Sequence, residues 1–452
     1  MSLEVVILAA GQGTRMKSGL PKVLHAVAGR PMLQHVVDSA QALSPLACHV
    51  VVGHGGDKVR EQLEQPGVQW VEQTEQLGTG HAVLQALPDL ADDSIVLVLY
   101  GDVPLITSAT LQTMVAAASK GPALLTAMMA DSGGYGRVVR DDTGAFVAVV
   151  EDKDASPEQK LIKEINSGVL AAPAAQLREW LPAVGNNNSQ GEYYLPDILS
   201  LAVSQGITVA TCQATSELEI LGVNDRVQLN QVEREYQQRQ AQALMLSGVT
   251  LADAGRIDVR GTLSCGSDVF IDANAVFIGD VSLGSNVQIG ANCVLINTSV
   301  DDGSEILPFS HLEQASVGKH CAVGPYARLR PAAVLAEGAK IGNFVEVKKS
   351  TIGKGSKVNH LTYIGDCEMG VGVNVGAGTI TCNYDGANKY VTTIGDGAFV
   401  GSNSTLVAPL TIAENGFVGA GSAITREVGS DQLAVSRAKQ RNIDGWKRPS
   451  KD

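Results

Sequence analysis

VGKHCAVGPYARLRPAAVLAEGAKIGNFVEV, residues 317–347, decides the fold of the second half of this 452-residue chain. Within this stretch an apolar residue returns at every sixth position, from Val317 through Leu329 to Val347. A period of six matches neither the 3.6 residues of a helical turn nor the two-residue alternation of a half-buried strand. It is typical of a parallel β-helix, in which each side of a triangular coil contributes one short strand and one turn.

The same spacing returns near the end of the chain, which argues against coincidence in a segment rich in Gly and Val. The second run consists of Ile394, Val400, Leu406, Ile412, Val418 and Ile424. We expect each apolar residue to point inward and to stack on the one three hexads later. Residues 381–392 interrupt the repeat, and we expect an external loop there, because an insertion in a solenoid must leave the coil at a corner. The repeat starts less regularly, at Ile271, Ile278, Leu283 and Ile289.

The first half has a different pattern. Apolar runs at 5–10, 49–52 and 95–99 alternate with longer segments of helical spacing, such as the one that begins at Met32. This alternation favours βα units and a mostly parallel, Rossmann-like sheet.

A single helix is predicted between the halves, at 225–247, which contains neither Gly nor Pro. Its expected apolar face consists of Leu229, Val232, Tyr236, Ala243 and Leu246. Such a helix is about 35 Å long, and Gly248 is suited to end it.

Composition limits the classes of function. The formal net charge of −13 argues against a nucleic-acid-binding surface, which needs clustered Lys and Arg. No apolar stretch reaches the 18 residues of a membrane span, and nothing basic precedes the N-terminal apolar run, so we expect neither a membrane anchor nor a signal peptide. Seven scattered cysteines without a CxxC pair predict a reduced, cytoplasmic protein.

A glycine turn, Gly11-Gln12-Gly13-Thr14-Arg15, follows the first apolar run directly. In an open α/β sheet, ligands bind beyond the carboxyl ends of the strands, where a turn without side chains lets backbone N–H groups approach phosphates. The turn is neither a Walker A loop nor a complete GxGxxG motif, so by itself it is equally compatible with a simple tight turn. Asp102, after another apolar run, is either a Mg²⁺ ligand or a capping residue.

LAAGQGTRM from Leu8 and LPKVLHAVAGRPML from Leu20 together resemble the sugar-phosphate nucleotidylyltransferases, over essentially the whole first half. The resemblance implies that Arg15 and Lys22 neutralise phosphate charge, and that Asp102 and Asn224 hold Mg²⁺ during in-line attack on the α-phosphorus. It implies that the nucleotide and sugar site further includes Leu8, Ala9, Ala10, Gly11, Gln73, Gly78, Thr79, Tyr100, Gly101, Gly136, Glu151 and Asn166. EQLGTGHA and NNNSQGEYYLPDI are similar to the uridylyl- and N-acetylglucosamine-specific branch.

The six-residue repeat resembles the hexapeptide acyltransferases. This resemblance implies a left-handed coil, although the general crossover rule favours the right hand, and acyl transfer from coenzyme A. His360 follows the inward position of Val358, so its side chain should face outward. A sugar amine that attacks a thioester needs a base, and histidine has a suitable pKa; a packed or surface histidine is the alternative. The basic residues Arg328, Arg330, Lys348 and Lys349 are either a phosphate clamp or solvated charges.

The segments RLRPAAVLAEGAKIGNFVEVKKS, NHLTYIGD and NVGAGTITCNYDGANKY complete a resemblance that spans nearly all 452 residues. They are similar to the bacterial bifunctional N-acetylglucosamine-1-phosphate uridylyltransferases and glucosamine-1-phosphate acetyltransferases. This resemblance implies that His360 is the base and that the amino-sugar phosphate is bound by Arg330, Lys348, Tyr363, Asn374 and Lys389. It implies that acetyl-CoA is bound by Ala377, Asn383, Tyr384, Ser402, Ala420 and Arg437, with the amide of Ser402 as a candidate oxyanion donor.

We therefore expect a cytoplasmic homotrimer with three segments: a nucleotidylyltransferase domain at 1–226, a linker helix at 227–247, and a left-handed β-helix with a C-terminal tail at 248–452. The expected reactions acetylate glucosamine 1-phosphate from acetyl-CoA and then join the product to UMP from UTP, giving UDP-N-acetylglucosamine, a precursor of peptidoglycan and lipopolysaccharide. Mg²⁺ is the expected cofactor, and neither nucleic acid nor membrane is an expected partner. The rival hypotheses are a single-function nucleotidylyltransferase with a structural or regulatory β-helix, and a non-enzymatic binding module.

Overall fold

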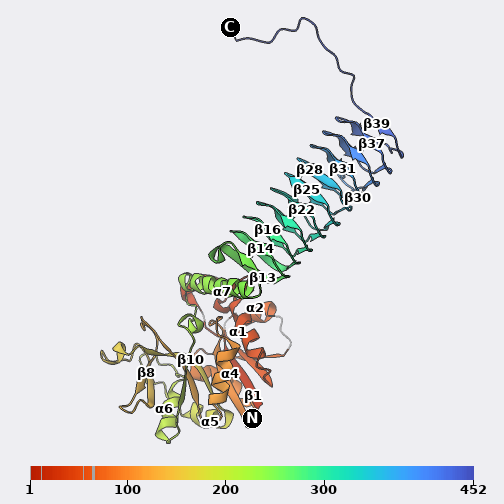
Figure 1. Cartoon of the computed structure of the whole chain (residues 1–452). Helices are drawn as coiled ribbons and strands as arrows, with labels where there is room; N and C mark the ends of the chain where they lie inside the picture. The colour runs from red at the N-terminus through yellow and green to blue at the C-terminus, as the bar shows by residue number, and fades with distance from the viewer. Residues whose placement is uncertain (1, 12, 54, 64–66, 452) are drawn as a thin grey trace. The chain divides into compact units, whose positions relative to one another are not determined.

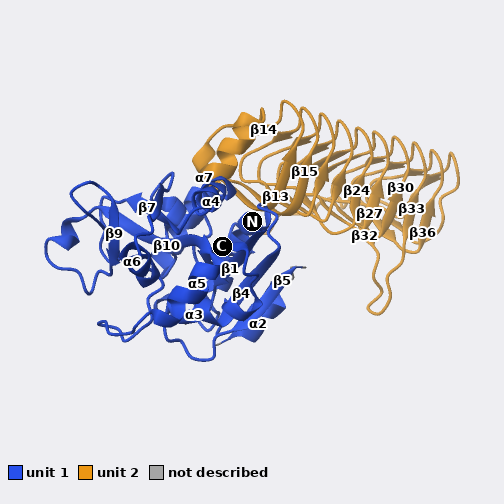
Figure 2. Cartoon of the chain, turned by 90° about the horizontal axis from the view of Figure 1, so that it is seen from below, with its two compact units in different colours: residues 1–236 blue, residues 237–452 orange. Residues whose placement is uncertain are grey.

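The computed structural model describes residues 2–11, 13–53, 55–63 and 67–451. The chain divides into two compact units, Met1–Tyr236 and Gln237–Asp452, shown in different colours in Figure 2. The division falls inside helix α7 (Arg226–Leu246).

A twisted sheet of nine strands is the centre of the first unit. Seven of them follow the order β11-β7-β10-β6-β1-β4-β5, and β8 and β9 extend the sheet beside β10. Their bounds are β1 Ser2–Leu8, β4 Ala47–Val52, β5 Val68–Glu72, β6 Ser94–Tyr100, β7 Ala123–Met128, β8 Arg137–Arg140, β9 Phe146–Val150, β10 Glu164–Pro173 and β11 Ala210–Gln213. The pairs of β1 with β4 and β6, and of β4 with β5, are parallel, whereas β10 runs antiparallel to β6 and β7. The mostly parallel sheet predicted from the sequence is confirmed.

Helices cover both faces of this sheet because alternate residues of β1 point to opposite sides. Val5 and Ile7 pack with residues of α1 (Met32–Gln41) and α4 (Ser108–Ala117), while Val6 and Leu8 pack with α3 (Thr79–Ala86), α5 (Ala174–Trp180) and α6 (Asp197–Ser204). The short helix α2 (Gly56–Gln62) follows β4, and β2 (Ala26–Val27) and β3 (Arg30–Pro31) form a small hairpin. The labelled elements can be followed in Figure 1. Because β1 pairs in parallel with both β4 and β6, the carboxyl ends of these three strands lie side by side at one edge of the sheet.

The second unit is a parallel β-helix, as the six-residue repeat predicts. Its first side consists of β12 Thr250–Leu251, β14 Phe270–Ile271, β16 Gln288–Ile289, β19 Glu305–Ile306, β22 Ala322–Val323, β25 Lys340–Asn343, β28 Lys357–His360, β31 Asn374–Val375, β34 Phe399–Val400, β37 Phe417–Val418 and β39 Leu433–Ala434. Two long strands, β13 Ile257–Cys265 and β15 Ala275–Leu283, begin the other two sides.

The second side then continues through β17 Val294–Ile296, β20 His311–Glu313, β23 Arg328–Leu329, β26 Glu346–Lys348, β29 Tyr363–Gly365, β32 Ile380–Cys382, β35 Thr405–Val407 and β38 Ala423–Ile424. The third side is formed by β18 Ser299–Val300, β21 Ser316–Val317, β24 Ala333–Leu335, β27 Ser350–Ile352, β30 Cys367–Met369, β33 Thr392–Ile394 and β36 Leu410–Ile412. Figure 2 shows these coils stacked along the unit, with a loop projecting from the coil near β32.

The register confirms the inward stack of the hexads. Val317 pairs with Leu335, and Leu329 pairs with Val347, so each apolar residue lies beneath the one three hexads later. All residues of both six-residue runs are buried. One residue of the irregular start was assigned wrongly: Ile278 lies outside the core, where Phe277 fills the inward position.

Helix α7 begins one residue later and ends one residue earlier than predicted, and Gly248, with φ +101°, follows it as expected. The predicted apolar face is correct only in its first half, where Leu229, Val232 and Tyr236 pack into the first unit. Ala243 and Leu246 are exposed, and Leu244 packs on the β-helix core instead. The prediction assumed one apolar face along the whole helix. It failed in the second half because the two halves of the helix pack against different cores.

Candidate functional site

The glycine turn after β1 lies at the carboxyl edge of the sheet. Gly13 has φ +63°, and a Cβ atom at this position would lie 2.6 Å from Cβ of Lys22. Glycine is therefore required twice, for the left-handed backbone and for the close approach of the lysine. Gly11 is exposed, and a Cβ atom at this position would meet no atom within 4 Å. Gln12, which the sequence placed in the same turn, lies outside the described residues.

Lys22, Asp102 and Asn224 converge from three distant parts of the chain. The ammonium of Lys22 donates to Oδ2 of Asp102 and, over 3.2 Å, to Oδ1 of Asn224. The side chains of Lys22 and Asp102 are only 13% and 16% exposed. A positive charge thus already lies between the two oxygen donors that the sequence assigned to Mg²⁺. A carboxylate and an amide oxygen are the hard ligands that this ion prefers, so the donor set fits the metal.

A cavity of about 310 Å³ opens beside this group. Ten of the predicted nucleotide-site residues line it: Leu8, Ala9, Ala10, Gly11, Lys22, Gln73, Gly78, Thr79, Tyr100 and Asp102. Gly101 is buried behind the cavity wall, where a Cβ atom would lie 3.0 Å from Leu33. Arg15 is exposed on the 3-10 turn Thr14–Met16 and does not line the cavity. The structure therefore brings together most of the predicted nucleotide site but leaves Arg15 outside it.

One wall of the cavity is held in place by hydrogen bonds and close backbone contacts. The side chain of Gln73 is buried and donates to the carbonyl of Gly78 over 3.2 Å. Gly78 has φ +112°, and a Cβ atom there would lie 2.6 Å from the carbonyl oxygen of Tyr193. The adjacent Thr79 begins α3, and its hydroxyl accepts from the amide of Leu195 over 3.1 Å. The segment around Tyr193 therefore fixes the position of this wall.

A second cavity of about 260 Å³ shares Thr79, Tyr100 and Glu192 with the first. The three predicted sugar-site residues Gly136, Glu151 and Asn166 line it. Burial raises the pKa of Glu151, and the carboxylates of Asp197, Asp154 and Asp152 raise it further. The two cavities adjoin each other through these shared residues.

Sequence reasoning missed several residues of these cavities. Gln76 and Glu192 line the first cavity, and Tyr194 lines the second. Gly168 is required because a Cβ atom there, at φ +86°, would lie 2.6 Å from the ring of Tyr100. Its place two residues after Asn166 was the available signal.

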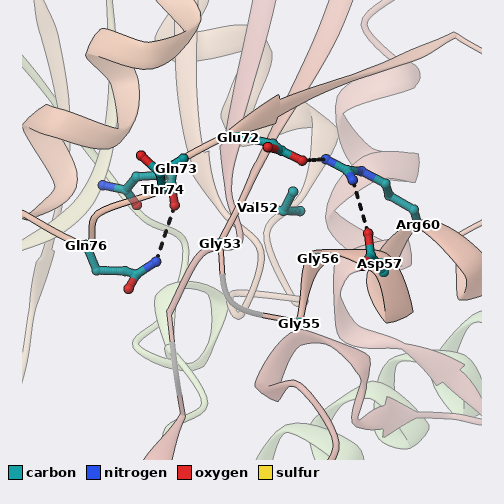
Figure 3. Close-up of a pocket in the computed structure, with 10 residues that line it drawn as sticks. All are labelled: Val52, Gly53, Gly55, Gly56, Asp57, Arg60, Glu72, Gln73, Thr74 and Gln76. Atoms are coloured by element: carbon teal, nitrogen blue, oxygen red, sulfur yellow. Dashed lines mark hydrogen bonds and ion pairs between the residues drawn. The ribbon is translucent and has the colours of Figure 1, made fainter.

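A third, polar cavity of about 390 Å³ adjoins the first and shares Gln73 and Gln76 with it. Figure 3 shows these two glutamines on one side and the ion-paired Arg60 on the other. Arg60 is held by Glu72 at 2.7 Å and by Asp57 at 3.3 Å. Two carboxylates neutralise this guanidinium, so among the described residues that line the cavity Arg60 is not free to bind an anion.

In the β-helix, the predicted base and three of the six predicted acetyl-CoA residues lie in a column at one corner, between the first and second sides. We define this corner column as Asn343, His360, Ala377, Ser402 and Ala420. Asn343 and His360 are register partners. The carbonyls of His360, Ala377 and Ser402 accept from the next coil at 3.3, 2.7 and 2.8 Å. Each column residue is followed by a residue with positive φ: Phe344, Leu361, Gly378, Asn403 and Gly421.

The imidazole of His360 is exposed at this corner, outside the coil. Its Nδ1 lies 2.9 Å from Oδ1 of Asn343. Nε2 has no hydrogen-bond partner within the described residues. The ring is therefore anchored through one nitrogen and presents the other to solvent.

Three of the predicted phosphate-binding residues lie close together by the second side, and we call them the basic cluster: Arg330, Lys348 and Lys389. Arg330 donates to Glu346 over 2.8 Å, and Glu346 is the register partner of Tyr363. The ammonium of Lys389 lowers the pKa of Lys348, and Arg330 lowers it further. Like charges held together in this way gain from binding a phosphate dianion. Sequence reasoning did not single out Glu346.

This basic cluster is not adjacent to the corner column within one chain. Lys348 ends strand β26, whereas Asn343 lies at the corner before that strand begins. The two groups are therefore separated by the width of the second side. Asn374 lies on the first side, three residues before Ala377 in the column.

Residues 383–391 leave the coil and are anchored at their base. The predicted interruption at 381–392 was too long at both ends, because Thr381 and Cys382 belong to β32 and Thr392 belongs to β33. Nδ2 of Asn383 donates to Oδ2 of Asp366 over 2.5 Å, and both side chains are buried. Tyr384 and Lys389 form an isolated antiparallel bridge, and both are exposed. At the far end of the column, the guanidinium of Arg437 donates to the carbonyl of Ala420.

Within the described residues there is no group of three or more His, Cys, Asp or Glu side chains that could hold a metal ion. A site of one carboxylate and one amide does not require such a group. Among the residues that the structure describes, no helix has both the length and the apolar composition needed to cross a bilayer.

Comparison with known proteins gives matches over both units. Residues 5–184 match the MobA-like NTP transferase domain, and residues 259–352 match the GMPPB C-terminal domain. Among curated proteins, "Bifunctional protein GlmU" of Marinobacter nauticus is 58% identical over 450 residues and covers 99% of both chains. The proteins of that name from Cellvibrio japonicus and Aromatoleum aromaticum are 56% and 55% identical, also over 99% of both chains.

Proposed function

The chain belongs to the family of bifunctional GlmU proteins, and from this premise we propose which residues carry out its two reactions. It is a transferase with two activities, the uridylyltransferase that forms UDP-N-acetylglucosamine and the glucosamine-1-phosphate acetyltransferase. Its product enters peptidoglycan biosynthesis. The rival hypothesis of an inert β-helix is set aside.

In the first unit, UTP occupies the cavity with its base against Gln73 and Gly78 and its phosphates over the glycine turn. N-acetylglucosamine 1-phosphate occupies the adjoining cavity near Glu151 and Asn166. A phosphate oxygen of the sugar phosphate attacks the α-phosphorus of UTP, and pyrophosphate leaves with the electrons of the broken P–O bond. The observation that carries this assignment is the convergence of Lys22, Asp102 and Asn224 beside the nucleotide cavity.

The family implies a divalent metal, and we assign it as Mg²⁺ held by Asp102 and Asn224. When bound, the ion neutralises the phosphate charge that develops during transfer. Lys22 lies against the same carboxylate, so with the ion held by Asp102 its ammonium would be available to a phosphate oxygen. Arg15 lies outside the cavity, so its proposed phosphate contact requires its exposed side chain to reorient.

In the second unit, the amine of glucosamine 1-phosphate attacks the thioester carbonyl of acetyl-CoA. A new C–N bond forms, and Nε2 of His360 takes the proton that the amine releases. The C–S bond then breaks with its electrons on sulfur, and the imidazolium returns the proton to give the thiol of coenzyme A. The backbone amide of Ser402 stabilises the oxyanion, and Arg330, Lys348 and Lys389 hold the sugar phosphate. The corner column supports this assignment, because it aligns His360 with the proposed acetyl-CoA residues.

We assign a homotrimer to the chain in which one copy's corner column faces another copy's basic cluster. The separation of the two groups within one chain supports this arrangement. A stack of exposed aromatic side chains continues the same corner: the ring centroids of Phe309 and Tyr326 lie 4.9 Å apart, and those of Tyr326 and Phe344 lie 5.4 Å apart. Such an apolar strip marks a protein contact. We also place the protein in the cytoplasm, in keeping with its seven free cysteines.

The assembly is tested with Phe344→Asp in the full chain by light scattering. We expect a monomer mass, loss of acetyl transfer and unchanged uridylyl transfer. The control Thr351→Asp, on an outward position of the third side, should remain trimeric. If the Phe344→Asp protein is still a trimer, the aromatic stack is not part of the interface.

The assignment of the two sites is tested by measuring both half-reactions on Asp102→Ala and His360→Ala. We expect each substitution to lower one activity by roughly 10²-fold or more and to leave the other within about twofold of the unsubstituted enzyme. Loss of both activities in either variant, with the fold intact by circular dichroism, would contradict two independent sites.

A further inference from the structure

Asn343 carries an inference that rests on the proposed role of His360 as the base. Asn343 lies one coil before the histidine at the same corner, and the pairing of β25 with β28 makes the two residues register partners. Oδ1 of Asn343 lies 2.9 Å from Nδ1 of His360. An amide oxygen only accepts hydrogen bonds, so the contact places the ring hydrogen on Nδ1.

We propose that Asn343 is a positioning residue that holds His360 in the Nδ1–H tautomer and so keeps Nε2 free to take the proton of the sugar amine. In a neutral imidazole one nitrogen carries hydrogen and the other accepts, and the partner of the first decides the state of the second. Without such a partner the ring also populates the Nε2–H tautomer. That form cannot act as a base through the nitrogen that faces the substrate.

The coil geometry makes Asn343 suitable for this task. A Cβ atom on the preceding Gly342 would collide with the backbone of Asn359, so the two coils are in tight contact just before the corner. After Asn343 the chain turns through Phe344, at φ +56°. Both backbone constraints fix the amide opposite the imidazole on the next coil.

No charged side chain competes with Asn343 for the imidazole. The ionisable residues on the adjoining elements are Lys340 on β25, Lys357 on β28, Glu346 and Lys348 on β26, and Tyr363 on β29. In the described part of the chain, none of them forms a hydrogen bond or ion pair with His360. A change of charge at residue 343 should therefore act on the imidazole directly.

Two substitutions in the full-length enzyme test the proposal through the pH dependence of acetyl transfer. Asn343→Asp places a carboxylate beside the imidazole, which raises the pKa of His360. We expect the acid limb of the kcat/KM profile to move to higher pH by about 0.5–1 unit. Asn343→Ala releases the tautomer, and we expect kcat to fall about 5- to 20-fold with KM nearly unchanged, a smaller loss than the roughly 10²- to 10⁴-fold expected for removal of the base itself.

The ¹⁵N chemical shifts of labelled His360 provide a readout that a merely structural role would not move. We expect Nε2 to appear as the unprotonated nitrogen at high pH in the unsubstituted enzyme, and mixed tautomers in Asn343→Ala. Asn292→Asp is the control, because Asn292 lies at the same corner four coils before His360, about 19 Å from it at one inter-strand spacing per coil. Its acid limb should not move.

The outcomes separate this proposal from the proposed function. If His360→Ala abolishes acetyl transfer but the acid limb of Asn343→Asp stays in place, Asn343 does not position the base. An Nε2–H tautomer in the unsubstituted enzyme would have the same meaning. If His360→Ala retains acetyl transfer, the assignment of the base itself is wrong. Thermal unfolding of each variant checks that the β-helix remains folded.

Discussion

At the residue scale, Gly13 controls the position of Lys22. The substitution Gly13→Ala introduces a Cβ atom 2.6 Å from the lysine Cβ and forces alanine to φ +63°. We expect the free energy of unfolding to fall by about 1–2 kcal/mol. Because the lysine is displaced from Asp102, we also expect uridylyl transfer to fall about tenfold or more. Steady-state kinetics and denaturant unfolding measure the two effects.

Gly19→Ala is the matched control for this substitution. Gly19 lies in the same surface segment, and its Cβ would meet no atom within 4 Å. We expect no change in uridylyl transfer and at most about 0.5 kcal/mol in stability. Equal losses in the two variants would show that the approach of Lys22 to the turn is not the cause.

Glu151 is proposed to bind the sugar, and we predict that its ionised carboxylate lowers the stability of the folded state. Burial and the nearby Asp197 raise its pKa above the unfolded value, so the folded state binds the proton more tightly. Stability therefore falls as the pH rises through the interval between the two pKa values, and the full cost is present at neutral pH. We expect Glu151→Gln to raise the unfolding temperature at pH 7 by about 2–4 °C if roughly 1 kcal/mol is relieved.

The same variant should lose about tenfold in uridylyl kcat/KM, because the carboxylate is proposed to bind the sugar. Thermal scans from pH 4 to pH 7 check the sign: the gain over the unsubstituted enzyme should vanish below about pH 4.3. Asp142→Asn, at an exposed position, serves as the control. A Glu151→Gln protein that is destabilised at pH 7 would contradict the stated cost.

Sequence reasoning predicted the position of a candidate residue best where that residue lies next to a strand end. The glycine turn and Asp102 could be placed by that reasoning, because parallel strands bring their carboxyl ends to one edge. Asn224 was placed only through resemblance, since it is 122 positions from Asp102. Asn343 could not be recognised, because its role depends on the register between two coils.

At the element scale, the hexad repeat assigns neighbouring residues to opposite sides of the coil wall. Leu335 is 2% exposed and Val334 is 42% exposed, although both belong to strand β24. We expect Leu335→Ala to lower the free energy of unfolding of the β-helix by about 2–5 kcal/mol through the cavity that it leaves. Val334→Ala should cost less than about 0.5 kcal/mol.

Urea unfolding monitored by the loss of acetyl transfer and of β-structure measures both variants. Uridylyl transfer in Leu335→Ala should persist, because its site lies in the other unit. Similar losses from the two substitutions would show that the inward and outward assignment is wrong.

The repeat also shows why the sequence could not supply every element. Coils of 18 residues join Val317 to Leu335 and Leu329 to Val347, as three hexads require. The next coils contain 17 residues, because Leu335 pairs with Ile352 and Val347 with Ile364. A corner that is one residue shorter changes the spacing of the repeat, but the inward residues remain stacked.

The antiparallel strand β10 was missed for a related reason. Its direction depends on pairing with distant strands and not on its own sequence pattern.

At the scale of the whole molecule, helix α7 decides where the chain can be divided. Val232, in its first half, is buried in a cluster of the first unit, and the amide of Ala28 donates to Glu233 over 2.6 Å. In its second half, Gln237 exchanges hydrogen bonds of 2.9 and 2.8 Å with Val259, and Ala241 joins the β-helix core. Each unit therefore needs its own half of the helix.

Two pairs of fragments test this dependence. Residues 1–246 and 226–452 each retain the whole helix, and we expect the first to keep uridylyl transfer and the second acetyl transfer, each within about threefold of the intact enzyme. Residues 1–226 and 248–452, cut at the ends of the linker proposed from the sequence, lose Val232 or Ala241 from a core. We expect the free energy of unfolding of each short fragment to be about 2–4 kcal/mol lower than that of the corresponding long fragment. Equal stability of the long and short fragments would show that the helix only connects the two units, and loss of either activity in the long fragments would show that the two reactions depend on each other.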